Sequence, residues 1–96
     1  MASTQIPADE MTLRQFQERI GKMYEARDRK RGTPATFLWF IEEVGELATA
    51  LAKDDPDNRE EEFADVLAWL CTLANINDVD LTCAIQKYLG QHPGFK

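Results

Sequence analysis

Apolar side chains recur along the chain at the three- and four-residue spacing of amphipathic helices, in segments that are separated by turn residues. Thr12 with Gln15 three residues later matches a capping box, so a first helix is expected from there to about Lys30. Polar and turn-forming residues then interrupt the pattern. Thr33 is the expected N-cap of a second helix, and Pro34 is its expected first residue.

The second and third helices are expected to form a helical hairpin. Apolar positions continue the second helix to about Lys53, where acidic residues and a proline form a turn. Either Asp55 or Asp57 can cap the third helix, which is expected to end near residues 75–77. Because the turn is short, the two helices are expected to pack antiparallel.

A fourth helix is expected over residues 81–89, with Asp80 as its N-cap and a glycine after its end. No stretch alternates polar and apolar residues at the period of a strand. The pattern therefore predicts an all-α antiparallel four-helix bundle over residues 12–90. A flexible leader, residues 1–11, would precede it, and a tail, residues 91–96, would follow.

The composition fits one small globular domain. The chain has 96 residues, of which 44% are hydrophobic and 29% are charged, so it can form a core that oligomerisation would strengthen. No apolar run is long enough to span a membrane, and the N-terminus does not resemble a signal peptide. Cys71 and Cys83 lie among apolar neighbours, so both are expected to be buried, reduced thiols. We therefore expect a cytoplasmic protein with no membrane partner.

The negative charge of the chain is concentrated in one segment. The net charge is −6, yet residues 41–65 hold ten acidic and two basic residues, which gives −8 there and +2 elsewhere. Binding to the phosphate backbone of a nucleic-acid polymer needs a basic surface, so it is not expected. The acidity has to be explained within this segment.

Two pairs of carboxylates in this segment have the spacing of neighbours on a helix. Glu43 and Glu46 lie three residues apart, and Glu62 and Asp65 repeat that spacing on the next helix. In an antiparallel hairpin the pairs can meet as a four-carboxylate cluster, which suits a hard divalent cation such as Mg²⁺ or Mn²⁺. Glu42 points about 100° away, toward a second ion or toward solvent.

A solvated acidic helix face is the alternative to a metal site. Two further features favour the metal site. The acids adjoin apolar positions that include Trp39 and Trp69, and Gly45 lies inside a helix at a cost of about 1 kcal/mol relative to alanine. We expect another backbone or a ligand to come close to this glycine.

These residues resemble a known family. Residues 42–47 read EEVGEL and residues 62–66 read EFADV, which is similar to the EExxE…ExxD signature of the MazG-like all-α nucleoside triphosphate pyrophosphohydrolases. The similarity extends from about Leu13 to Lys87. It implies a MazG-like helical fold that is completed by pairing into homodimers or homotetramers.

The resemblance also implies an activity: Mg²⁺-assisted hydrolysis of an NTP or dNTP to the monophosphate and pyrophosphate, by attack of water at the α-phosphorus. The expected role is removal of unwanted nucleotides from the pool. The implied metal ligands are Glu43, Glu46, Glu62 and Asp65, with Glu42 in support. Because a triphosphate and a −8 segment repel, the cation would bridge them and also activate water. Glu46 is the candidate proton acceptor, and Glu43 is the other candidate catalytic residue.

Candidate substrate contacts lie around the acidic cluster. A basic run contains Arg29, Lys30 and Arg31, which either complement the dipole at the end of the first helix or hold phosphates. Lys87 matches a phosphate-contacting lysine of similar proteins, although the tail that follows departs from their pattern. Trp39 is either a core residue or a stacking surface for a base.

The sequence also has to be compared with other functions. A di-iron bundle usually needs Glu-x-x-His motifs, and the only histidine, His92, lies after the last expected helix. A non-catalytic helical interaction module would carry the acids as surface charge. Within the enzyme class, phosphoribosyl-ATP pyrophosphohydrolase and dUTP hydrolase are the nearest alternatives.

Overall fold

The structure, a computed structural model, describes residues 7–90, which form helices and turns without any strand. This confirms the all-helical class. Three long helices make up most of this part of the chain: α1 (Leu13–Arg31), α2 (Thr33–Lys53) and α3 (Pro56–Ile76). Two short 3-10 turns (Ala8–Glu10 and Ile85–Tyr88) and a brief α4 (Leu81–Ala84) complete it. Residues 1–6 and 91–96, which include most of the expected leader and all of the expected tail, lie outside the described residues.

The start of α1 is fixed by the expected capping box. The Gln15 backbone N–H donates to the Thr12 hydroxyl at 3.0 Å, and the Thr12 N–H donates to the Gln15 side chain at 2.8 Å. These two bonds satisfy backbone donors that a helix leaves unpaired at its N-terminus. The N-terminal boundary of the first helix is therefore confirmed.

One residue, Gly32, separates α1 from α2. It ends the first helix and is also the N-cap of the second, with φ 87° and ψ 165°. The expectations that Thr33 is the N-cap and Pro34 the first residue are both wrong by one position, because Thr33 is already the first residue of α2. The reason is that the sharp change of direction needs a positive φ, which glycine adopts without steric cost.

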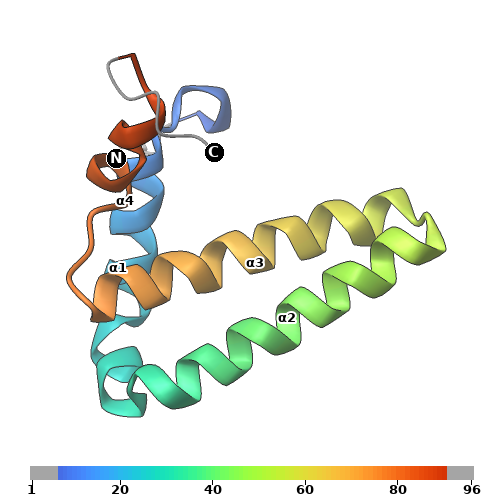
Figure 1. Cartoon of the computed structure of the whole chain (residues 1–96), viewed down its shortest axis with the longest axis horizontal. Coiled ribbons are helices and arrows are strands. Elements are labelled where there is room, and N and C mark those ends of the chain that lie inside the picture. The colour runs from blue at the N-terminus through green and yellow to red at the C-terminus, as the bar shows by residue number, and fades with distance from the viewer. Residues whose placement is uncertain (1–6, 91–96) are drawn as a thin grey trace, which may run out of the picture.

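The hairpin of α2 and α3 is the longest helical contact of the molecule. The helices are antiparallel and lie side by side, joined through Asp54 and Asp55 (Figure 1). Asp55 is the N-cap of α3 and accepts the Asn58 N–H at 3.3 Å, which decides between the two expected caps. Asp54 takes the left-handed conformation that ends α2.

The other helices depart from the expected bundle. α1 packs on α3 but crosses the hairpin steeply rather than running along it, and α4 packs on α1 (Figure 1). The expected helix over residues 81–89 is only partly correct, because the α-helix ends at Ala84 and continues as a 3-10 turn. A helix this short is held by tertiary contacts rather than by its own propensity. The described part of the chain is thus an α2–α3 hairpin crossed by α1.

The buried core of the described residues is small. The hydrophobic side chains that are almost fully buried are Ile20, Ala50, Cys71 and Ala74. Cys71 is buried as expected, but the same expectation for Cys83 is wrong, since that thiol is exposed on the short α4. No helix among the described residues is long and apolar enough to cross a membrane.

Candidate metal and nucleotide site

The α2–α3 hairpin brings together carboxylates from both acidic pairs. Glu43 of α2 and Glu62 and Asp65 of α3 each place an oxygen so that all three oxygens lie within 4.8 Å of one another. The i, i+3 spacing within α3 turns Glu62 and Asp65 to one side of that helix, and the antiparallel pairing supplies Glu43 from the facing helix. The two acidic motifs therefore meet, but as a set of three carboxylates rather than the expected four, because Glu46 is not part of it.

The carboxylates of this cluster are short of partners. Oε2 of Glu43 and Oε1 of Glu62 are buried and have no hydrogen-bond donor among the described residues. Buried polar atoms are nearly always paired, so two orphaned carboxylate oxygens next to a third carboxylate fit a cation-binding site. An all-oxygen donor set of this kind fits Mg²⁺ or Mn²⁺.

The electrostatics of the cluster agree with this geometry. Burial, and then the neighbouring Glu46, Asp65 and Glu62 carboxylates, raise the pKa of Glu43 to about 7. Burial and the same negative surroundings also raise the pKa of Glu62. Both shifts reflect negative charge held without a compensating cation, which a bound divalent ion would reverse.

Glu46 and Glu42, the other two expected metal ligands, lie outside the three-carboxylate set. Glu46 is exposed and does not belong to that set, although its carboxylate is close enough to act on the pKa of Glu43. Glu42 is exposed as well. Gly45 lies between Glu43 and Glu46. Apart from its chain neighbours and the backbone of its own helix, no described atom lies within 4 Å of the position that a Cβ would take. The expected close approach at this glycine therefore does not occur within the described residues.

The two tryptophans meet at one end of the cluster. The Trp39 and Trp69 rings are stacked, with 6.3 Å between centroids and 12° between planes. The stacking joins Trp39 of α2 to Trp69 of α3 across the hairpin. Trp39 is 48% exposed, so one aromatic surface beside the carboxylates is open to solvent.

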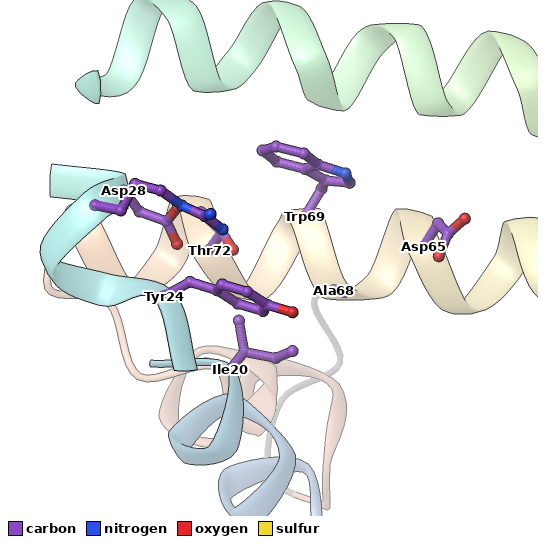
Figure 2. Close-up of a pocket in the computed structure, with 8 residues that line it drawn as sticks. Ile20, Tyr24, Asp28, Asp65, Ala68, Trp69 and Thr72 are labelled. Atoms are coloured by element: carbon purple, nitrogen blue, oxygen red, sulfur yellow. The ribbon is translucent and has the colours of Figure 1, made fainter. Parts of the chain in front are cut away.

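A cavity of about 270 Å³ lies between α1 and α3 and borders the cluster. Asp65 and Trp69 contribute to its wall from α3, while Tyr24 and Asp28 contribute from α1; Figure 2 shows Trp69 projecting toward α2 and Tyr24 facing it from below. The cavity therefore joins an acidic edge to an aromatic wall. Tyr24 and Asp28 are not among the expected site residues, because the residues that face them across the cavity come from α3, which sequence spacing along α1 does not reveal.

The basic residues expected to hold phosphates are placed elsewhere. Arg29 pairs with Glu25 at 2.8 Å and with Asp78 at 2.7 Å, and it donates to the Asn75 carbonyl at 2.9 Å. These contacts lie at the C-terminal end of α3, about 15 Å along the helix axis from Asp65 at 1.5 Å per residue. Arg29 therefore ties α1 to α3 away from the carboxylate cluster.

Lys30, Arg31 and Lys87 have three different environments. Lys30 is exposed at the end of α1. Arg31 pairs with Asp28 and lies over the Trp69 ring, with 5.1 Å from its guanidinium carbon to the ring centroid. The Lys87 ammonium lies 5.0 Å from the Tyr88 ring, in the 3-10 turn that follows α4. None of the three forms an ion pair with Glu43, Glu62 or Asp65 among the described residues.

Comparison with known proteins adds one finding. The family model for the MazG nucleotide pyrophosphohydrolase domain matches residues 31–93, which is more than half of the chain and includes both acidic motifs. No curated protein matches the chain at a significant level.

Proposed function

The chain belongs to the MazG nucleotide pyrophosphohydrolase family, and we propose that it hydrolyses a nucleoside triphosphate, NTP or dNTP, to the monophosphate and pyrophosphate. The observation that carries this proposal is the meeting of Glu43, Glu62 and Asp65, whose oxygens lie within 4.8 Å of one another. Family membership supports nucleotide pyrophosphohydrolysis in general. The carboxylate cluster supports a dependence on a divalent cation.

The proposed cofactor is Mg²⁺, with Mn²⁺ as a substitute. Glu43, Glu62 and Asp65 would hold the cation, and their orphaned oxygens support this assignment. Glu46 and Glu42 would support the site from the exposed side of α2. A bound divalent cation would neutralise phosphate oxygens and lower the pKa of the attacking water.

Glu46 is the proposed acceptor of the proton of that water. Its carboxylate neighbours Glu43 yet lies outside the three-carboxylate set, so it keeps an oxygen for proton transfer. Water would attack the α-phosphorus, and pyrophosphate would leave. As a ligand of the cation, Glu43 would orient the phosphate group that reacts.

The stacked Trp39–Trp69 pair and the adjoining cavity are the proposed contacts for the base. An exposed aromatic surface beside the carboxylates can stack on a base, a contact worth about 1–3 kcal/mol. The cavity, about 270 Å³ in volume, reaches from Asp65 to this aromatic wall. A nucleotide can thus lie with its phosphates at the acidic edge and its base at the indoles.

We also propose that the active protein is a homodimer or a homotetramer. Large apolar side chains of the hairpin are 40% or more exposed in the single chain, among them Phe37, Leu38, Ile41, Phe63 and Leu67. Because the buried core is small, covering these side chains with a second copy would supply the missing burial. The partner is a copy of this chain, because the apolar face is shared by both helices of the hairpin.

A metal titration separates this function from a non-catalytic interaction module. We expect Mg²⁺ or Mn²⁺ to bind the wild-type chain in calorimetry, and Glu43→Ala or Asp65→Ala to abolish the binding heat. Glu60→Ala, which removes an exposed acid of the same hairpin, is the matched control and should bind normally. Equal binding by all four proteins, or no binding at all, would favour the interaction module.

A nucleotide panel then tests the reaction. Canonical and modified NTPs and dNTPs, together with dUTP and phosphoribosyl-ATP, are incubated with the protein and Mg²⁺, and the products are identified by chromatography. We expect a monophosphate and pyrophosphate, and loss of turnover on addition of EDTA. Release of orthophosphate as the first product would contradict the proposed bond, and turnover that resists EDTA would contradict the role of the cation.

A further inference from the structure

Arg31 is held in a buried polar network at the end of α1. Its guanidinium pairs with Asp28, which is 3% exposed, and its Nε donates to the Thr36 hydroxyl at 3.0 Å. Thr36 is fully buried, and its hydroxyl donates in turn to the Gly32 carbonyl at 2.7 Å. The guanidinium is thus fixed from two sides, across the link between α1 and α2.

The held guanidinium lies over the Trp69 ring. The distance from its central carbon to the ring centroid is 5.1 Å, within the range of a cation–π contact. Trp69 is in turn stacked on Trp39 and forms the wall of the cavity that also contains Asp65. Figure 2 shows Asp28 and Trp69 at the same cavity. A chain of contacts therefore runs from the buried Asp28 through Arg31 to the indole beside the carboxylates.

We propose that Arg31 is a positioning residue: held by Asp28 and Thr36, it fixes the Trp69 indole where that ring meets the base of the nucleotide. This proposal rests on the proposed function. It reassigns Arg31 from the phosphates to the base, because Asp28 and Thr36 bind two of its three nitrogens and hold the guanidinium over the Trp69 ring. A residue that held phosphates would instead point free donors at the acidic edge.

The variant Arg31→Lys tests this positioning without unpairing Asp28. Lysine keeps the positive charge but loses the planar fork that bonds Thr36 and stacks on an indole. Thr36→Val is the second variant, because it removes the acceptor for Arg31 and leaves the ion pair with Asp28. Arg19→Lys, an exposed position on the same helix, is the matched control.

The first readout is the near-ultraviolet circular dichroism of the free protein. The chain has two tryptophans, Trp39 and Trp69, so the tryptophan signal reports their stacked pair. We expect Arg31→Lys and Thr36→Val to reduce this signal while the far-ultraviolet spectrum is retained, and Arg19→Lys to leave it unchanged. An unchanged signal in Arg31→Lys would overturn the proposal.

The second readout compares the two products of the reaction, measured with Mg²⁺ by calorimetry. The monophosphate of the best substrate carries the base, and pyrophosphate carries none. We expect Arg31→Lys to bind the monophosphate about tenfold more weakly, in line with the loss of one stacking contact, and to bind pyrophosphate as the wild type does. In turnover, KM should rise while kcat changes little.

The outcomes of this comparison are distinct. Weaker binding of pyrophosphate would make Arg31 a phosphate ligand, and unchanged binding of both products would make its contacts merely structural; either result overturns the proposal. A wild-type chain that binds neither product would refute the proposed function itself, and this proposal with it. If the positioning proposal alone is wrong, the wild-type chain still binds its products, and only the results for the variants show the failure.

Discussion

Glu43 shows at the scale of one residue why the site calls for a cation. Its carboxylate is partly buried on α2, faces Glu62 and Asp65 across the hairpin, and has one oxygen without a donor among the described residues. Burial, followed by the carboxylates of Glu46, Asp65 and Glu62, raises its pKa to about 7, against an ordinary value of 4.5. Without a cation, ionising this group therefore opposes folding.

This shift predicts how the stability of the metal-free protein depends on pH. Between pH 4.5 and 7 the folded chain holds a proton on Glu43 that the unfolded chain has released, so the free energy of unfolding falls as the pH rises through that window. Glu43→Gln removes the penalty. We expect it to raise the Tm at pH 8 in EDTA by a few degrees and to flatten the profile of Tm against pH, measured by circular dichroism.

Two control measurements test this prediction. Glu60→Gln, an exposed acid of the same hairpin, should keep the wild-type profile. Adding Mg²⁺ at pH 8 should raise the Tm of the wild type far more than that of Glu43→Gln, because the ligand is lost. A wild-type Tm that climbs between pH 5 and 7 in EDTA would contradict the raised pKa.

At the scale of elements, local signals in the sequence predict the long helices well. The capping box at Thr12 and the Asp55 cap define the starts of α1 and α3, because a cap depends on residues within one turn. The meeting of the acidic pairs follows from i, i+3 spacing and the short turn. The cap of α2 is missed because Gly32 ends one helix and begins the next, and the extent of α4 is missed because tertiary contacts set it.

Buried polar residues are the part of the site that the sequence does not reveal. Asp28 and Thr36 look like ordinary polar positions of a helix, yet both are buried because another segment packs over them. The i, i+3 spacing of Asp28 and Arg31 is the one available signal. It does not indicate burial unless the place where α3 crosses α1 is known.

Gln17 joins three segments through its side-chain amide. The amide nitrogen donates to the Asn75 side chain at 3.0 Å and to the Val79 carbonyl at 2.7 Å, and the amide oxygen accepts the Leu81 N–H at 2.9 Å. The group thus connects α1 to the end of α3 and to the start of α4. Without it, the Val79 carbonyl and the Leu81 N–H would lose the side chain that pairs with them.

We expect Gln17→Ala to lower the free energy of unfolding by about 2–4 kcal/mol, since a buried polar group left unpaired costs about 1–3 kcal/mol. Urea denaturation followed by circular dichroism measures this loss. Gln86→Ala is the matched control, because Gln86 is exposed and donates a single bond to the Thr82 carbonyl, so its effect should stay within about 0.5 kcal/mol. Equal losses in the two variants would contradict the structural role of Gln17.

At the scale of the whole molecule, the single chain leaves much of its apolar surface uncovered. Leu38 is 70% exposed on α2, and Phe63 is 53% exposed on the facing helix. Isolated exposed apolar residues are normal, but a series of them along both helices of one hairpin indicates an interaction surface. Self-association is the simplest way for such a face to be covered.

Leu38→Asp is therefore expected to weaken self-association more than about tenfold, because it places a charge on that face. Sedimentation velocity over a range of concentrations measures the effect. Gln86→Asp adds the same charge at an exposed polar position outside the hairpin and should leave the assembly intact. A wild-type chain that sediments as an 11.0 kDa monomer at all concentrations would rule out the proposed assembly.

The two-residue connection between α2 and α3 has a consequence for the order of folding. Closing so short a loop costs little entropy, so the hairpin that carries both acidic motifs consists of contacts that form early. The contacts of α1 with α3 join residues far apart in the sequence, such as Gln17 and Asn75, and must form later. The carboxylates would then come together before the aromatic wall does, and a divalent cation in the refolding buffer would speed the first of these steps by relieving their repulsion.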